Sequence, residues 1–387
     1  MSETAHYLLA EIERLAPSIG ARSAEIEQLG YIPADIVDEL RRIGIFRMFV
    51  PRERGGLELD FPDAAEAITA LGRIDGSIGW TAMIGGGSSM FTALLPKDLY
   101  DDVYRHGPDV AVAGSAFLSG TAEATAGGWK VTGRWPFASG CLHADWILGL
   151  CVMQEDGKPI AGAVEGTPLT KAFVLPASEW DIEDSWHVIG LQGTGSRHVT
   201  LQDTFVPAGN FFDLRGPACL SGPLYNGIPQ LIPLLHAANN LGMAEAAMKE
   251  VVALATTGHR QQRASGAMRD SEVFQLEIGR IQADIRAARA FLRAQVASHW
   301  DHALAGTLAT NELLVEGAQM ATWVTATCVR IVDSCYALGG STAIYETSAL
   351  QRQLRDIHTA AQHGMVQQRM FITGGALVLD QARQREA

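Results

Sequence analysis

The sequence predicts a mainly helical α+β protein in which a β-domain lies between two helical regions. Three observations predict this order: apolar residues recur at helical spacing in the first hundred residues, β-branched and aromatic residues alternate with polar ones in the middle, and long Ala- and Leu-rich runs follow. We expect an N-terminal helical domain at 1–107, a middle antiparallel β-domain at 108–222 and a C-terminal four-helix-type bundle at 223–387.

The first region is expected to consist of amphipathic helices joined by a loop. Apolar residues follow helical spacing over 8–19 and again over 36–45. The loop VPRERGGLELDF, at 50–61, interrupts this pattern with a proline and paired glycines, and a further helix resumes with Asp63 close to its start.

The middle region has the pattern of a β-sandwich or β-barrel. Strand-like alternation occurs in segments such as 129–135, 145–153 and 198–207, and glycine clusters separate them. No helical crossover lies between these segments at the spacing that a parallel sheet needs. We therefore expect antiparallel strands.

The last region is expected to form a helical bundle. Two Ala- and Leu-rich runs, at 241–258 and 273–300, are long enough for extended helices. In the second run Ile278, Ile281 and Ile285 form one apolar stripe. Long helices of this kind usually pack as a bundle.

Length and composition exclude several classes of function. The chain has 387 residues, of which 47% are hydrophobic and 19% charged, and its formal net charge is -13. This charge argues against nonspecific nucleic-acid binding. No apolar stretch approaches the ~20 residues that span a membrane, and the first residues do not resemble a signal peptide. We expect a cytoplasmic protein without nucleic-acid or membrane partners.

Two segments of the middle region are candidate ligand sites. GRWPFASGCLHADW, at 133–146, concentrates aromatic and small polar residues, and forms either core or a wall for a planar ligand. GLQGTGS, at 190–196, precedes an expected strand rather than a helix, so it does not fit a dinucleotide fingerprint. We expect a tight loop that brings Thr194 and Ser196 close to a ligand. The sequence shows no recognisable nicotinamide or nucleoside triphosphate site.

Cysteine and histidine spacing predicts no metal. The five cysteines are scattered without CxxC spacing, which fits neither a disulfide framework nor a zinc site. His358 and His363 are five residues apart on an expected helix, which places them about 140° apart around its axis. Either one is a surface or core histidine or, because histidine titrates near neutral pH, a candidate general base.

Four motifs together resemble the acyl-CoA dehydrogenase superfamily over nearly the whole chain. The loop at 50–61 resembles its Pro-x-x-x-Gly-Gly loop, and WKVTGRWPFASG at 129–140 resembles its flavin-facing strand. The segment 190–207 resembles its second β-domain signature, and 336–356 its Gly-Gly and Arg-Asp C-terminal helices. The resemblance implies an acyl-CoA dehydrogenase-like fold and a flavin as the planar ligand.

One departure points to a particular branch of the superfamily. The dehydrogenases use a glutamate after the Arg-Asp pair to abstract a proton α to a thioester, but 357–369 contain no carboxylate. The chain instead resembles two-component flavin-dependent monooxygenases, in which a histidine and a serine face the flavin; the matching positions are His363 and Ser139. The resemblance implies that Ser139 stabilises a C4a-hydroperoxyflavin and that His363 is the general base.

The resemblance also implies the remaining ligand contacts. The cofactor would be FADH2 or FMNH2, with O2 as co-substrate, and Arg263, or alternatively Arg260, would bind its phosphate. A neighbouring subunit of a homotetramer or homodimer would contribute the Gly339–Gly340 turn. The expected cofactor-binding residues are Trp135, Phe137, Ala138, Ser139, Trp186, Thr194, Ser196, Arg263, Gly339 and Gly340, and the expected substrate-pocket residues are Trp80, Met83, Phe91 and His143.

Most of the expected pocket residues belong to the segment 78–96. Its run Gly85–Gly87 leaves space for a molecule larger than a simple phenol. Helix packing is the alternative interpretation of this segment, and a structural role is the alternative for His143.

We therefore expect an oxygenase that hydroxylates a phenolic, polyketide or indole-type aromatic molecule. Without a nicotinamide site, it would receive reduced flavin from a separate NAD(P)H-dependent flavin reductase. The alternatives are an acyl-CoA dehydrogenase with a relocated base, an N-oxygenase of an amine or amino sugar, and a flavin-free scaffold.

Overall fold

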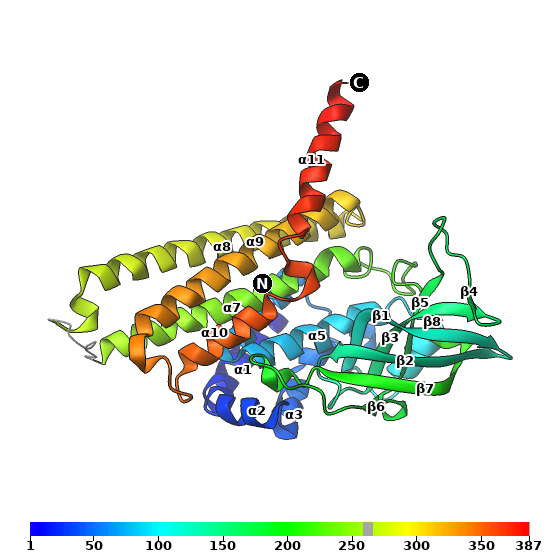
Figure 1. Ribbon diagram of the computed structural model, residues 1–387, viewed down its shortest axis with the longest axis horizontal. Helices are drawn as coiled ribbons and strands as arrows, with labels where there is room; N and C mark the ends of the chain where they lie inside the picture. Colours follow the sequence, from blue (N-terminus) through cyan, green and yellow to red (C-terminus); the bar gives the residue numbers. More distant parts are fainter. Residues whose placement is uncertain (258–265, 387) are drawn as a thin grey trace.

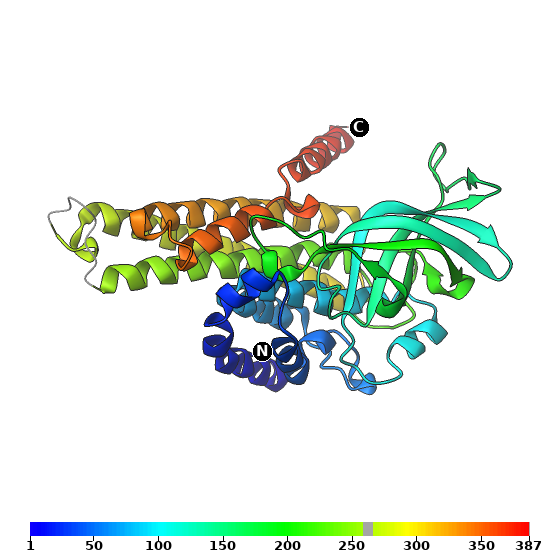
Figure 2. The ribbon, with the colours of Figure 1, turned by 60° about the horizontal axis from the view of Figure 1, so that its bottom comes forward.

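The computed structural model describes residues 1–257 and 266–386 and has the expected order of helices, sheet and helices. In Figure 1 the long C-terminal helices lie side by side, and the sheet lies at one end of this bundle. Figure 2 shows the N-terminal helices against one side of the bundle, where α4 (Phe61–Ile74) and α5 (Gly76–Thr92) contact α7 (Ile228–Thr256). Arg260 and Arg263, the expected phosphate ligands, lie outside the described residues. Within those residues no helix is both long and apolar enough to cross a membrane.

The N-terminal region consists of helices joined by loops, as expected. The carboxylate of Asp75 caps α5 by accepting the N–H groups of Ser77 and Ile78 at 2.9 and 3.2 Å, which satisfies two of the free donors at the helix start. The helices are α1 (Glu3–Gly20), α2 (Ser23–Leu29), α3 (Ala34–Ile43), α4 (Phe61–Ile74), α5 (Gly76–Thr92) and α6 (Lys97–Val103).

The middle region forms a mixed sheet, which corrects the expectation of a purely antiparallel one. The strands are in the order β6-β7-β2-β1-β3-β5-β8, with β4 also paired to β3. The pair β1 and β3 is parallel, because the connection 139–145 passes the start of β1 and brings β3 to its free side. The strands are β1 (Val112–Thr125), β2 (Gly128–Ala138), β3 (Trp146–Glu155), β4 (Lys158–Pro159), β5 (Thr170–Pro176), β6 (Asp181–Ile182), β7 (Arg197–Pro207) and β8 (Phe211–Phe212).

The core of the β-domain contains Trp135, contrary to the expectation that this residue contacts the cofactor. Its side chain has no exposed surface, and its ring centroid lies 5.8 Å from Phe173 and 5.1 Å from Trp180. Its indole N–H donates to the Leu150 carbonyl at 2.8 Å, so its one polar group is satisfied inside the domain. Ala138, also expected at the cofactor, is likewise fully buried in this core.

In its described residues, the C-terminal region has three helices of 29 to 33 residues, a shorter one of 12 residues and a projecting terminal helix. Helix α10 ends at Ala360, so His363 lies after the helix and not on it as expected, with φ of -63° and ψ of 134°. Figure 1 shows α11 extending away from the body of the molecule. The helices are α7 (Ile228–Thr256), α8 (Glu272–Leu304), α9 (Asn311–Gly339), α10 (Ala349–Ala360) and α11 (Met370–Glu386).

Helix α10 is joined to the β-domain through the loop before η4 (Gln192–Thr194). The Leu191 N–H donates to the buried Asp356 carboxylate at 2.6 Å, and Arg355 donates to the Ile189 carbonyl at 2.6 Å. Gly190 allows this close approach, since a Cβ there would lie 2.1 Å from the Arg355 carbonyl oxygen. The Arg-Asp pair that the sequence analysis singled out therefore holds the bundle and the sheet together.

The buried carboxyl of Asp356 predicts a pH-dependent stability. Burial, and then the charge of nearby Asp75, raise the pKa of Asp356 to about 7, whereas an unfolded aspartate has a pKa of about 3.9. The folded state therefore holds the proton more tightly, so the Asp356 contribution to the free energy of unfolding is complete below about pH 4 and is lost as pH rises through about 7.

Asp356→Asn keeps an oxygen for Leu191 but cannot ionise. Relative to the unmodified protein, we expect its free energy of unfolding to rise by up to about 2–3 kcal/mol between pH 5 and pH 8, measured by chemical denaturation at several pH values. The exposed Asp156→Asn is the matched control for loss of one charge. A difference that does not vary with pH for Asp356→Asn would contradict this assignment.

Candidate active site

Residues from five separate segments of the chain meet between the N-terminal helices, the sheet and the bundle. Their side chains are connected by hydrogen bonds or ring contacts, and all except His363 are at most 7% exposed. They are Trp80 on α5, Ser139 after β2, Thr194 and Ser196 at η4, His236 on α7, and His363 before η8 (Gly364–Val366). The structure thus brings both expected catalytic residues, Ser139 and His363, into contact with Trp80 and adds His236, which was not expected.

A chain of hydroxyl groups forms the first part of the site. The Trp80 indole N–H donates to Ser139 Oγ at 3.0 Å, and Ser139 Oγ lies 2.7 Å from Ser196 Oγ. Ser196 Oγ in turn lies 2.7 Å from Thr194 Oγ1, which donates to the Leu191 carbonyl at 2.8 Å. The chain therefore begins at an N–H group and ends at a carbonyl oxygen.

An aromatic surface lies next to these hydroxyl groups. Phe137, two residues before Ser139, has a φ of 64° at a register shift between β2 and β7, and its ring is 51% exposed. Its ring centroid lies 5.5 Å from Phe117 and 6.2 Å from Trp186. A side chain held at positive φ costs about 1–3 kcal/mol and is often found at functional sites. An exposed flat apolar surface beside hydroxyl groups fits a ring system with an apolar face and a polar edge, as a flavin has.

Two stacked histidines form the second part of the site. The ring centroids of His236 and His363 are 4.2 Å apart, and both rings contact Trp80, at 5.1 and 5.6 Å. Burial lowers the pKa of His363 to about 4 and, with the neighbouring His363, lowers the pKa of His236 well below 6.5. Both imidazoles are therefore neutral at pH 7.

The hydrogen bond to Met365 fixes how His363 presents its ring. Its Nδ1 accepts the Met365 N–H at 3.4 Å, so the neutral ring carries its proton on Nε2. In this tautomer His363 donates a hydrogen bond. His236, stacked on this ring, has a buried Nδ1 with no hydrogen-bond partner among the described residues.

His236 differs from the other buried histidine of the bundle. His299 uses Nδ1 with Gln295 at 3.2 Å and Nε2 with the Leu313 carbonyl at 2.9 Å. An unpaired buried polar group costs about 1–3 kcal/mol, so a histidine that serves only packing normally has its partners. His236 lies within an apolar stretch of α7 and gives no local sequence signal, which is why it was missed. Only its contact with His363 identifies it.

The expected pocket residues on α5 are only partly near this cluster. Met83 is buried one turn from Trp80, but Phe91 lies about 16 Å further along the helix axis than Trp80. The glycine run does not provide the expected space: a Cβ would lie 2.7 Å from the Phe46 ring at Gly85 and 2.8 Å from the Ile45 carbonyl at Gly86. The first two glycines therefore serve close packing.

His143 lies close to the cluster, at the edge of its hydroxyl side. A Cβ on Gly140 would lie 3.0 Å from His143 Nε2 and 3.5 Å from the Thr81 methyl group, so both side chains lie against Gly140. Burial, with a smaller effect of Arg41, lowers the pKa of His143 to about 4. The Thr81 hydroxyl has no partner among the described residues.

Other expected residues lie away from the cluster within the chain. Gly339 and Gly340 are at the far end of α10, about 18 Å along that helix from its end near His363. His358 is half-exposed and pairs with Asp333 at 2.8 Å, which is a surface role. Among the described residues no group of His, Cys, Asp and Glu could hold a metal ion.

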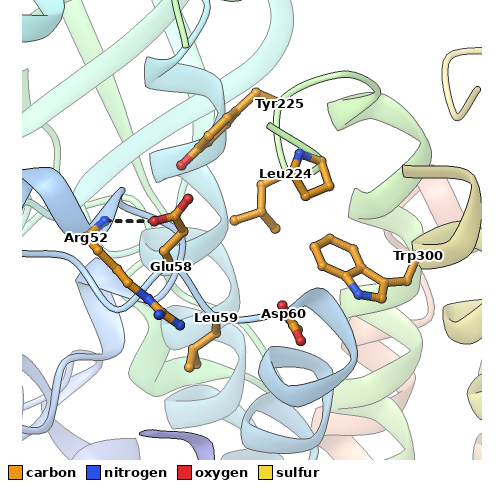
Figure 3. A pocket seen from close by; sticks show the side chains of 8 residues that line it. Arg52, Glu58, Leu59, Asp60, Leu224, Tyr225 and Trp300 are labelled. Atoms are coloured by element: carbon orange, nitrogen blue, oxygen red, sulfur yellow. Dashed lines mark hydrogen bonds between the residues drawn. The ribbon is translucent and has the colours of Figure 1, made fainter. Parts of the chain in front are cut away.

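A cavity of about 240 Å³ opens at another place, between the loop at 50–61, the segment before α7 and α8 (Figure 3). Arg52, Glu58 and Trp300 line it, and the Arg52 N–H donates to Glu58 at 2.9 Å. None of the catalytic or cofactor-binding residues expected from the sequence lines this cavity.

The unpaired nitrogen of His236 predicts an unusual effect on stability. We expect His236→Leu to leave the free energy of unfolding unchanged or to raise it by about 1 kcal/mol, because it removes an unsatisfied buried polar group. The matched control His299→Leu removes two hydrogen bonds and should lower it by about 1–3 kcal/mol. Chemical denaturation measures both. Equal losses in the two variants would show that His236 is an ordinary structural histidine.

Comparisons with known proteins agree with this geometry. Residues 3–96 match the acyl-CoA dehydrogenase N-terminal domain, and residues 234–368 match the acyl-CoA dehydrogenase C-terminal domain. The chain is 30% identical to the indole-3-acetate monooxygenase of Pseudomonas putida, with 92% of this chain and 90% of the relative covered. It is 28% identical to the oxygenase subunit HsaA of a flavin-dependent monooxygenase from Rhodococcus jostii, covering 92% and 93%.

The solved structures show the same relationship. XiaF from Streptomyces sp., determined in complex with FADH2 and glycerol, has a TM-score of 0.91 at 25% identity and covers 98% of this chain and 96% of its own. These findings confirm the expected fold class, the expected enzyme class and reduced flavin as the cofactor of the family. The chain belongs to the acyl-CoA dehydrogenase superfamily, in the branch formed by the oxygenase components of flavin-dependent monooxygenases.

Proposed function

We propose that this protein hydroxylates a phenolic, polyketide or indole-type aromatic molecule with FADH2 and O2. The observation that carries the proposal is the meeting at Trp80 of a hydroxyl chain and a neutral imidazole pair. The hydroxyl chain would form hydrogen bonds with the polar edge of a flavin. The imidazole pair would form them with the O–H or N–H group of an aromatic substrate. The relative that acts on indole-3-acetate supports an indole-type substrate.

The cofactor would lie against the exposed aromatic surface. When bound, reduced flavin supplies the electrons that activate O2. Phe137 and Trp186 would contact its ring, and Ser139 would bond to its polar edge. The burial of Ser139 and Trp80 keeps water out of this side of the site, which favours oxygen transfer to the substrate over release of hydrogen peroxide.

The substrate would bind to the imidazole pair. His363 has a donor N–H, and the unpaired Nδ1 of His236 would accept in the tautomer protonated on Nε2. Together they could bind a hydroxyl group, which both donates and accepts, whereas a ring N–H, which only donates, would use His236 alone. Drawing the proton toward His236 makes the aromatic carbon more nucleophilic. We therefore extend the general-base role expected for His363 to the pair. Met83 and His143 would complete the wall.

We also propose the partners that the family implies. A separate NAD(P)H-dependent flavin reductase would supply the reduced flavin, as the designation of a relative as an oxygenase subunit supports. A homotetramer or homodimer would bring Gly339 and Gly340 to a neighbouring cofactor. The large apolar side chains of Ile344 and Tyr345, each 65% exposed just after this turn, support such a contact.

The test of the function is a turnover assay with defined substrates. The protein is mixed with FADH2, regenerated by a flavin reductase and NADH, in oxygenated buffer with a panel of phenols and indoles. Incorporation of oxygen from ¹⁸O2 into a product supports the proposal. Oxidation of acyl-CoA thioesters with dye reduction, and no product from any aromatic compound, would instead indicate a dehydrogenase. Oxygenation of amines alone would indicate an N-oxygenase.

The imidazole pair predicts the effect of His363→Ala. FADH2 binding should be kept, while the rate of hydroxylation falls by about 10²-fold or more and hydrogen peroxide release rises. The variant loses the N–H that holds the substrate hydroxyl for proton removal at His236, and general-base catalysis contributes about 10²–10⁴-fold. Product and peroxide are quantified per FADH2 consumed. His358→Ala, a surface histidine five residues earlier, is the matched control. If His363→Ala kept the product yield of the unmodified protein, the role would be wrong.

A further inference from the structure

The direction of every hydrogen bond in the hydroxyl chain follows from its two ends. The Leu191 carbonyl oxygen can only accept, so the Thr194 hydroxyl, 2.8 Å away, must donate its single hydrogen to it. Thr194 Oγ1 has then no hydrogen left for Ser196. The 2.7 Å contact between these two oxygens therefore requires Ser196 to be the donor.

The same reasoning fixes Ser139. Ser196 has given its hydrogen to Thr194, so in the 2.7 Å contact with Ser139 the donor must be Ser139. At the other end, the Trp80 N–H can only donate, and it occupies one lone pair of Ser139 Oγ at 3.0 Å. Ser139 is left with one lone pair and no hydrogen for a ligand.

Reversing this direction is unfavourable. It would require Thr194 to leave the Leu191 carbonyl, and a lost buried hydrogen bond costs more than the bond itself contributes in water. Leu191 cannot move away easily, because its N–H is held by Asp356 at 2.6 Å. Its carbonyl also accepts the Trp186 indole N–H at 3.1 Å. Ser139 is thus a preorganised acceptor.

We propose that Ser139, oriented through Ser196 and Thr194 by the Leu191 carbonyl, acts as a hydrogen-bond acceptor that selects reduced over oxidised flavin. This rests on the proposed function. Reduced flavin carries a hydrogen on N5, which can donate to the Ser139 lone pair. Oxidised flavin has a lone pair on N5 instead, and two facing lone pairs repel. Thr194 is therefore a positioning residue for the redox selectivity of the site.

The experiment measures the dissociation constants of FADH2 and FAD, anaerobically and without substrate or turnover. We expect FADH2 to bind more tightly to the unmodified protein. In Thr194→Val, Ser196 can donate to Ser139 instead, which frees the Ser139 hydrogen to bond to oxidised flavin. The ratio of the FAD dissociation constant to the FADH2 dissociation constant should therefore fall roughly three- to tenfold, chiefly through tighter FAD binding. Thr194→Ser keeps the hydroxyl and should restore the ratio.

Two further variants make the result specific. Thr322→Val is the matched control, because Thr322 is fully buried on α9 and also donates to a backbone carbonyl, that of Ala318 at 2.8 Å. Its ratio should equal that of the unmodified protein. Ser139→Ala removes the acceptor and should weaken FADH2 binding more than FAD binding, which also tests the proposal if Thr194→Val does not fold.

The outcomes separate this proposal from the proposed function. If neither flavin form binds the unmodified protein, both are wrong. If both forms bind but Ser139→Ala and Thr194→Val keep the ratio of dissociation constants of the unmodified protein, the redox selection is wrong while the oxygenase function stands. A fall of the ratio in Thr322→Val as large as that in Thr194→Val would also overturn the selection, because the effect would not depend on the hydroxyl chain.

Discussion

The peptide group of Leu191 is the fixed point on which the site depends. Its N–H is bonded to the buried Asp356 of α10, and its carbonyl accepts hydrogen bonds from Trp186 and Thr194. Leu191 itself has a φ of 50°, an unfavourable conformation for a residue with a Cβ, which the three contacts stabilise. The bundle, the loop and the sheet therefore share one anchoring group. The orientation of the hydroxyl chain is a consequence of how the domains are joined.

The glycines of this loop serve the same purpose. Gly190 has no room for a Cβ beside Arg355 of α10, and a Cβ on Gly193 would lie 2.2 Å from Ile26 of α2. Their density suggests a phosphate-binding loop when only the sequence is seen. In the fold they allow one loop to pack between two helices, which brings Thr194 and Ser196 to Ser139. Close packing of this loop therefore also positions the two hydroxyl groups expected to contact the ligand.

The sequence predicted the elements well and the orientation of side chains less well. Periodicity indicated the helices and strands, and the family resemblance indicated Ser139 and His363. Trp135 was misplaced because alternation along β2 is broken by the positive φ of Phe137, which turns Phe137 outward and leaves Trp135 in the core. His236 could not be found at all, because its significance arises from contact with a residue far away in the chain.

The neutral imidazole pair has a physical reason in a site of this kind. A carboxylate in such a buried place resists ionisation, as Asp356 shows with a pKa raised to about 7. It would act as a base only if the free-energy cost of desolvation were offset or if water entered the site. Neutral His236 and His363 accept and donate hydrogen bonds without a buried charge, so the pocket can exclude water while a proton is transferred. A dehydrogenase that removes a proton from a thioester substrate benefits from a negatively charged base. An oxygenase that must exclude water benefits from the absence of that buried charge. The loss of the carboxylate after Asp356 and the presence of stacked histidines are, on this argument, one adaptation.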